Sequence, residues 1–190
     1  EVYGRAHEVI GEFHKQSKIR FDIISKFSSS VLVRYPIDLI DRIKHHCEEL
    51  DVSHMEGYMF HSYVEFKDYI SKDPLILEKI KRSGLVNKIG VSVYTNSHIE
   101  EIFNYEEINL IQLPFNLFDN ELLRMGFLKR AKTKGIEVHT RSAFLQGLFF
   151  KDLEKLPIVL YPLREGLATI KKIVTKYQVS MAELALNYVA

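Results

Sequence analysis

The sequence predicts an α/β protein built as a (β/α)8 barrel, of which about five of the eight strands can be recognised. Short apolar runs of strand length alternate with longer amphipathic stretches along the 190 residues. Such alternation requires a parallel sheet covered by helices. An open dinucleotide-binding sheet would also satisfy it, but that fold normally has a G-x-G-x-x-G turn after its first strand, and this sequence contains none. We therefore favour the barrel.

Five runs rich in β-branched or aromatic residues are the predicted strands. They span residues 21–25, 57–60, 88–93, 109–113 and 136–140. Between them lie amphipathic helices with start and stop signals: Pro36 in a first turn, Asp73-Pro74 before a stretch that Gly84 ends, and a capping box from Ser180 to Glu183. The helix expected after residue 119 or 120 would bury four residues, Leu122, Leu123, Phe127 and Ala131.

Composition excludes several classes of protein. The net charge of +1 argues against a basic nucleic-acid binder, and no run approaches the ~18 apolar residues of a membrane helix. The one cysteine, Cys47, fits a reducing compartment, so we expect a cytoplasmic protein. We expect residues 1–190 to form one barrel domain, truncated at both ends because the chain starts at Glu1 and stops within an apolar helical pattern at Ala190.

A polar residue lies at or near the carboxyl end of each predicted strand, where barrel enzymes place their working groups. These residues are Lys26, His61, Ser92, Gln112 and Arg141, the last followed by Ser142. Each has a structural explanation by itself, such as a solvated strand end or a hydrogen-bonded core histidine. Five at one edge together indicate a polar pocket.

Tyr3 suggests a reaction class for this pocket. It precedes an amphipathic helix whose apolar positions are Ala6, Val9, Ile10 and Phe13. A phenol is a poor proton donor near neutral pH, but a neighbouring ammonium such as that of Lys26 lowers its pKa. With His61 orienting a carbonyl group, the set predicts general acid catalysis of carbonyl reduction.

Six short segments, taken in order and spacing, resemble the aldo-keto reductase family. They are residues 1–4 (EVYG), 23–27 (IISKF), 59–61 (MFH), 89–92 (IGVS), 111–116 (IQLPFN) and 141–147 (RSAFLQG). The resemblance implies a (β/α)8 barrel that uses NADPH, less often NADH, to reduce an aldehyde or ketone, including sugar-like carbonyls. It implies that Tyr3 donates the proton, that Lys26 activates Tyr3 and that His61 orients the substrate. It also implies that Ser92 and Gln112 hold the nicotinamide carboxamide, with Arg141 near the nicotinamide ring and Ser142 on the diphosphate side.

Three departures from the family pattern keep alternatives open. The family's catalytic Asp would precede Glu1, Val93 replaces the usual Asn, and Arg141 replaces a ring-stacking Tyr of many members. One alternative is therefore a catalytically weak or inactive nucleotide-binding protein with a regulatory or interaction role. Another is a Schiff-base aldolase that uses Lys26.

We expect no metal. His45 and His46 are consecutive, so their side chains point about 100° apart on a helix, and the i, i+4 spacing of a helical zinc pair is missing.

Overall fold

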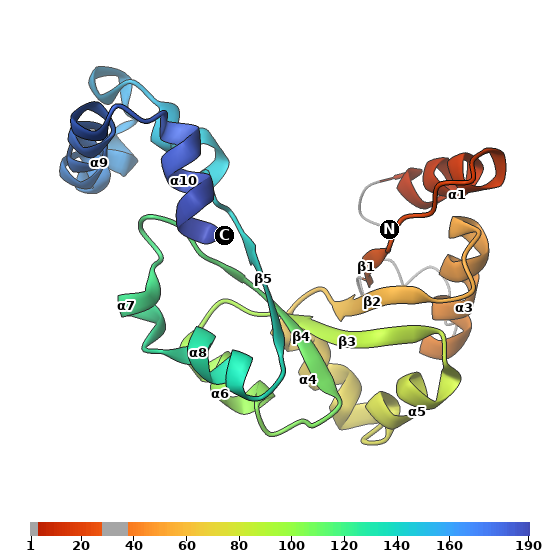
Figure 1. The fold of residues 1–190 in the computed structure, drawn as a ribbon. Coiled ribbons are helices and arrows are strands. Elements are labelled where there is room, and N and C mark those ends of the chain that lie inside the picture. The colour runs from red at the N-terminus through yellow and green to blue at the C-terminus, as the bar shows by residue number, and fades with distance from the viewer. Residues whose placement is uncertain (1–3, 28–37) are drawn as a thin grey trace. The chain divides into compact units, whose positions relative to one another are not determined.

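A computed structural model of the chain describes residues 4–27 and 38–190 (Figure 1). Within these residues five strands form one sheet in sequential order: β1 (Ile24–Phe27), β2 (Met55–Phe60), β3 (Val86–Ser92), β4 (Ile108–Pro114) and β5 (Glu137–Arg141). The pairings of β1 with β2, β2 with β3 and β3 with β4 are parallel. The predicted α/β class with sequential parallel strands is confirmed.

Helices alternate with these strands. They are α1 (Ala6–Gln16), α3 (Leu39–Leu50), α4 (Tyr63–Lys72), α5 (Ile76–Ser83), α6 (Asn96–Ile102), α7 (Glu121–Arg124), α8 (Phe127–Thr133), α9 (Arg164–Tyr177) and α10 (Met181–Val189). Three short 3-10 turns precede α9: η1 (Leu145–Phe150), η2 (Leu153–Lys155) and η3 (Ile158–Leu163). The predicted cap at Gly84 and the capping box at Ser180 are both present, whereas Pro36 lies outside the described residues. None of the described helices is long and apolar enough to cross a membrane.

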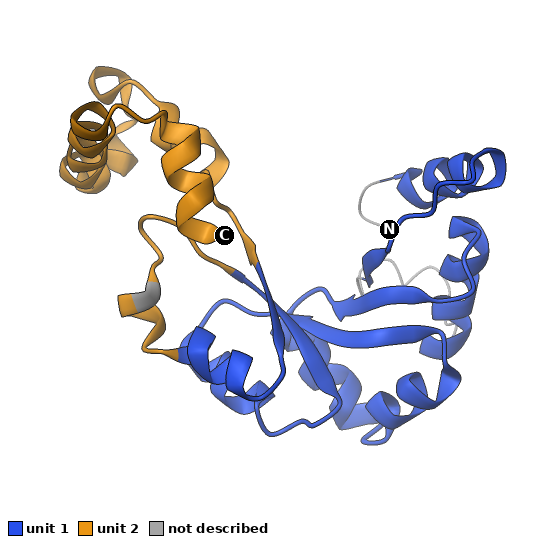
Figure 2. Cartoon of the chain, in the orientation of Figure 1, with its two compact units in different colours: residues 1–113, 127–139 blue, residues 114–126, 140–190 orange. Residues whose placement is uncertain are grey.

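The chain divides into two compact units (Figure 2). The first contains Glu1–Leu113 and Phe127–His139, and the second Pro114–Gly126 and Thr140–Ala190. In the first unit, helices α4, α5, α6 and α8 lie together on one side of the sheet (Figure 1). Together with α3, they enclose an apolar core that includes Ile43, Phe60, Phe66, Val91 and Ile102. The second unit has its own smaller core around Leu148, Phe149, Leu167 and Ala185.

The single helix expected after residue 119 is instead two short ones. The backbone at Met125 adopts a left-handed conformation (φ 52°), which ends α7 and separates it from α8. Phe127 and Ala131 are buried as predicted, but Leu122 is 87% exposed and Leu123 is 56% exposed. The prediction for these two leucines was wrong because the apolar periodicity does not show that the helix is interrupted at Met125.

The first predicted strand and helix also differ from the structure. β1 begins at Ile24, three residues later than predicted, and the Phe21 ring stacks instead on Phe13 of α1 at 5.3 Å between centroids. Val9 and Phe13 are largely exposed, and the residues of α1 that are buried are Gly11 and His14. Phe21, which the sequence placed in the first strand, therefore packs against α1 outside the sheet.

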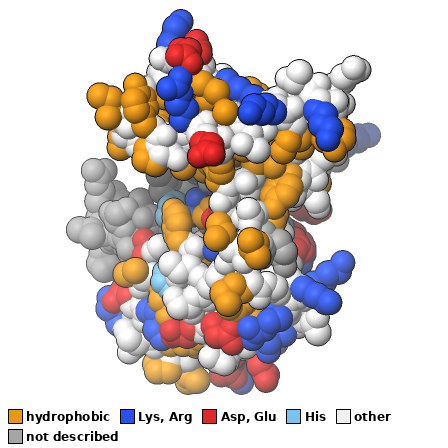
Figure 3. All heavy atoms as spheres, turned by 90° about the vertical axis from the view of Figure 1, so that its left-hand side faces the viewer, with side chains coloured by type: hydrophobic (Ala, Val, Ile, Leu, Met, Phe, Trp, Pro, Cys, Tyr) orange, Lys and Arg blue, Asp and Glu red, His pale blue; other side chains and the backbone are white. Residues whose placement is uncertain are grey.

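Acidic, basic and apolar side chains are interspersed on the face shown in Figure 3. Large apolar side chains that are exposed in the second unit include Leu122, Met125, Ile158 and Val159. Neither sign of charge dominates this face, in keeping with the net charge of +1.

Candidate active site

Side chains of the sheet alternate between two faces that differ in packing. The outer face, which carries Phe27, Phe60, Val91 and Leu113, packs into the core beneath the helices. The inner face has glycines on two neighbouring strands: a Cβ on Gly57 would touch Ile24 and Leu110, and one on Gly90 would touch Met59 and Leu110. Every second side chain of a strand lies on the same face of the sheet. Lys26, Ser92 and Gln112 therefore belong to this inner face, nearer its carboxyl edge.

Lys26 and Gln112 meet across the inner face. The Lys26 ammonium donates a hydrogen bond to Oε1 of Gln112, although the residues lie on β1 and β4 with two strands between them. In a flat sheet the two backbones would be about 14 Å apart. The contact therefore requires a sheet curved toward its inner face, as in a barrel.

His61 and Ser92 lie at the carboxyl ends of the two strands between Lys26 and Gln112. Ser92 is the last residue of β3, pairs in register with Gln112 and is 3% exposed. His61 follows directly after β2, and its buried Nδ1 atom has no hydrogen-bond partner among the residues described. A buried, unpartnered ring nitrogen costs free energy unless something else bonds to it, which is expected of a group that contacts a ligand.

The remaining predicted site residues are Tyr3, Arg141 and Ser142. Tyr3 lies outside the described residues. Arg141 and Ser142 belong to the second unit, where the Arg141 carbonyl accepts a hydrogen bond from the Phe115 N–H at 3.1 Å. The Arg141 guanidinium reaches Ser142 Oγ at 3.5 Å, and Ser142 has a positive φ of 62°.

Val93, one of the three departures from the family pattern named above, does not belong to the inner face. Its side chain is completely buried in the apolar core of the first unit. Its N–H donates to the Gln112 carbonyl at 2.8 Å, so it continues the pairing of β3 with β4. Val93 therefore contributes packing and backbone pairing rather than a polar contact.

A second group of polar side chains, which the sequence did not reveal, links α4 to α6. The Tyr63 hydroxyl and the Lys67 ammonium both donate to the Glu101 carboxylate, and the Tyr63 ring stacks on His98 at 3.9 Å. Burial, followed by the hydrogen bond to Glu101, raises the pKa of Tyr63 to about 12. A phenol with that pKa is a weaker acid than ordinary tyrosine, so this group fits a role in holding two helices together.

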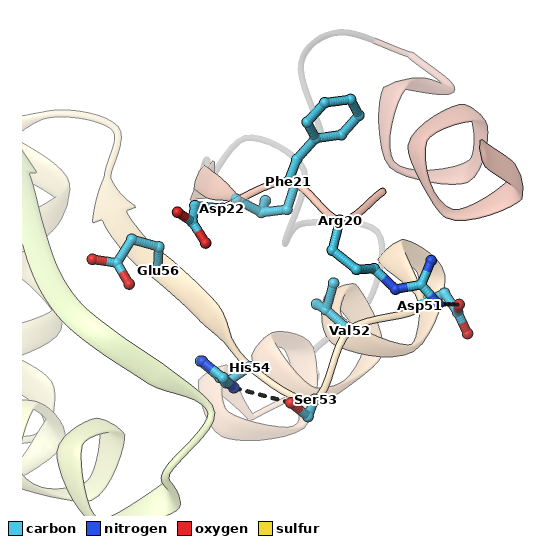
Figure 4. Close-up of a pocket in the computed structure, with 9 residues that line it drawn as sticks. Arg20, Phe21, Asp22, Asp51, Val52, Ser53, His54 and Glu56 are labelled. Atoms are coloured by element: carbon cyan, nitrogen blue, oxygen red, sulfur yellow. Dashed lines mark hydrogen bonds and ion pairs between the residues drawn. The ribbon is translucent and has the colours of Figure 1, made fainter. Parts of the chain in front are cut away.

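A pocket of about 280 Å³ opens at the opposite edge of the sheet, near the amino ends of β1 and β2 (Figure 4). Arg20 approaches Asp51 at 3.3 Å there, and Ser53 contacts His54 at 3.0 Å. In barrels this edge contributes stability, whereas catalysis takes place at the carboxyl edge. The pocket is therefore not our candidate active site.

A family model described as the aldo/keto reductase family matches residues 1–190. The chain belongs to this family. The NADH-specific methylglyoxal reductase of Escherichia coli is 27% identical to this chain over 119 residues, which are 60% of this chain and 35% of that protein.

Solved structures share the fold. A glycerol dehydrogenase from Gluconobacter oxydans superimposes with a TM-score of 0.69 at 17% identity, covering 96% of this chain and 64% of that one. An aldo/keto reductase from Brucella melitensis gives a TM-score of 0.65 at 18% identity, covering 97% and 65%. The likeness confirms the predicted barrel-type fold. The chain spans about a third of the methylglyoxal reductase and less than two thirds of these structures.

Aldo/keto reductases use nicotinamide cofactors, and the polar residues of the inner face fit a carboxamide. Oxygen Oε1 of Gln112 accepts from Lys26, so the Gln112 NH2 group can donate to a carboxamide oxygen. The Ser92 hydroxyl on the neighbouring strand can donate or accept. The two side chains thus offer complementary partners for both ends of an amide.

Proposed function

We propose that this protein reduces an aldehyde or ketone by hydride transfer from a nicotinamide cofactor. The observation that carries the proposal is the hydrogen bond between Lys26 and Gln112 across the inner face. It joins the lysine that would activate the proton donor to the amide that would hold the cofactor, so both functions meet at one edge of the sheet. NADH or NADPH, when bound, supplies the hydride.

The chain's own residues would position the reactants and move the proton. Ser92 and Gln112 would hold the carboxamide, and the family resemblance assigns Arg141 to the nicotinamide ring and Ser142 to the diphosphate side. His61 Nδ1, buried and without a protein partner among the described residues, hydrogen-bonds the substrate carbonyl oxygen. The Tyr3 phenol would give its proton to that oxygen when the cofactor supplies hydride to the carbonyl carbon, and the Lys26 ammonium would stabilise the resulting phenolate.

Small carbonyl compounds are the proposed substrate class. The relative named as a methylglyoxal reductase suggests dicarbonyls as the first compounds to test. The family resemblance favours NADPH, whereas that relative is named as NADH-specific, so both cofactors belong in the same assay. Oxidation of each is followed with the full-length protein and methylglyoxal, simple aldehydes, ketones and sugars.

Tyr3→Phe is the decisive variant. We expect turnover to fall at least ~100-fold while the cofactor dissociation constant is unchanged, because the change removes the proton donor alone. Tyr63→Phe is the matched control: it also removes a tyrosine hydroxyl, but from the helix contact with Glu101, and should leave turnover unaltered.

Other outcomes favour the alternative functions. Equal turnover in Tyr3→Phe and the parent protein would contradict the role of Tyr3. Cofactor binding without turnover of any carbonyl would favour a regulatory protein, and borohydride trapping of a substrate on Lys26 would favour an aldolase.

A further inference from the structure

Two histidines and a glutamate come together on the outer side of β1, away from the candidate active site. His7 belongs to α1, whereas His46 and Glu49 belong to α3, and one ligand atom from each lies within 4.8 Å of the others. His46 is 3% exposed. The side chains of His7 and Glu49 are 13% and 30% exposed, so the group is largely enclosed with one more open side.

The two helices that carry this group pack in direct backbone contact. A Cβ on Gly11 of α1 would lie 1.9 Å from the Glu49 carbonyl oxygen of α3, so only glycine permits this approach. His46 and Glu49 are three residues apart and share one face of α3. The close approach places His7 opposite that face, with His7 Nδ1 at 3.3 Å from Glu49 Oε2.

A hydroxyl group from the sheet orients each histidine. His7 Nε2 contacts Ser25 Oγ on β1 at 2.8 Å, and His46 Nδ1 contacts the Tyr58 hydroxyl on β2 at 3.0 Å. A hydrogen bond to one ring nitrogen that fixes the ring and directs the other nitrogen is the usual surrounding of a metal-ligating histidine. Burial, with the neighbouring His46 as the second cause, lowers the pKa of His7 and favours the neutral ring that binds metals.

We propose that His7 Nδ1, His46 Nε2 and the Glu49 carboxylate bind one Zn²⁺ ion, with water as the fourth ligand. Zinc bond lengths near 2.1 Å place tetrahedral ligand atoms about 3.4 Å apart. His7 Nδ1 and the Glu49 carboxylate already have this separation. The ligand nitrogen of His46 lies within 4.8 Å of them and must move closer by about 1 Å or slightly more. The ion would fasten α1 to α3.

The site is separate from the proposed chemistry. Ser25, which supports His7, and Lys26, which contacts Gln112, are consecutive residues of β1 and point to opposite faces of the sheet. The consecutive pair His45-His46 did not suggest zinc, because the relevant partner of His46 is a histidine on another helix. Zinc binding would thus affect stability and leave the cofactor site in place.

The test uses the untagged full-length protein, first freed of metal by a chelator. We expect calorimetry to show one Zn²⁺ bound per chain, Zn²⁺ to raise the unfolding temperature, and Co²⁺ to give the visible absorption of a tetrahedral complex. Glu49→Gln and His7→Asn should each weaken zinc affinity at least about 100-fold, and Ser25→Ala about 10- to 100-fold. His54→Asn, which removes an exposed imidazole elsewhere, should not change it.

Circular dichroism of the metal-free variants shows whether they are folded. If Glu49→Gln fails to fold, Ser25→Ala and the Co²⁺ spectrum of the parent protein still decide the question. Absence of Zn²⁺ binding by the parent protein, or equal affinity in parent, Glu49→Gln and Ser25→Ala, would overturn the proposal.

Discussion

Lys26 and Lys88 are lysines of the same sheet, but their contacts lie at opposite edges of it. Lys26, near the carboxyl end of β1, donates to the neutral amide of Gln112. Lys88, near the amino end of β3, lies 2.6 Å from a Glu56 oxygen and 2.7 Å from a Glu137 oxygen. The two carboxylates, Glu137 first, raise the pKa of Lys88.

The difference indicates how the position of a lysine in the sheet is related to its role. A lysine between two carboxylates has its charge neutralised locally and is suited to joining strands. A lysine at the carboxyl edge, beside His61, Ser92 and Gln112, is placed to act on a group of a ligand or on a phenol whose pKa it can lower. The carboxyl edge of the sheet is thus suited to chemistry and the amino edge to ion pairing.

Replacing each lysine by methionine is the strongest test of this contrast. We expect Lys26→Met to reduce carbonyl turnover at least about 100-fold, equivalent to about 2.7 kcal/mol of transition-state stabilisation, and to be strongly non-additive with Tyr3→Phe. Lys88→Met should leave turnover unchanged. Steady-state kinetics of the full-length proteins measure both, and similar losses in the two variants would remove the distinction.

Gly90→Ala disturbs the inner face of the sheet, which carries Lys26, and leaves both lysines in the sequence. The new Cβ would lie 2.9 Å from Met59 Cγ and 3.0 Å from the Leu110 carbonyl oxygen, so backbone must shift. We expect the free energy of unfolding to fall by about 1 to 3 kcal/mol in urea denaturation. Gly57→Ala should cost less because its close contacts are the ends of Leu110 and Ile24 side chains. An equal or larger loss in Gly57→Ala would contradict this account of the inner face.

Gln112→Glu replaces the amide that Lys26 contacts by a carboxylate. The added negative charge opposes the effect of Lys26 on the phenol and removes the NH2 donor for the carboxamide. We expect turnover to fall about 10-fold with weaker cofactor binding. Asn87→Asp, which adds the same charge beside Lys88, is the control and should change neither quantity. Equal changes of turnover and cofactor binding in Gln112→Glu and Asn87→Asp would indicate that the added negative charge acts without the contact to Lys26.

The smallest expected effect is the pH dependence of the Lys88 ion pairs. The hydrogen bonds from Lys88 are the main cause that lowers the pKa of Glu56 and of Glu137. Carboxyl groups with lowered pKa stabilise the fold above their ordinary pKa of about 4.3, and this contribution is lost as the pH falls below it. The urea midpoint of Lys88→Met should therefore lie slightly below that of the parent protein at pH 7. The gap should close below about pH 4, and a gap that widens in acid would contradict the assignment.

The fold was more predictable from sequence than the contacts of the site. The strands β2 to β5 follow from apolar runs, and the polar residue at or near the end of each run marks the carboxyl edge of the sheet. The contact of Lys26 with Gln112 could not be predicted from the sequence, because the residues are 86 positions apart and meet only through the curvature of the sheet. Likewise, spacing rules along one helix cannot bring His7 of α1 to His46 of α3.

The sequential strand order has a consequence for synthesis. Each new strand that leaves the ribosome finds its neighbour already made, so the sheet can grow from β1 toward β5 as the chain emerges. Local pairing of this kind favours rapid folding, since each added loop closes over a short stretch of chain. The bond between Lys26 and Gln112 is an exception, because it forms only after β4 has joined. The carboxyl edge is therefore completed late, after most of the sheet that supports it.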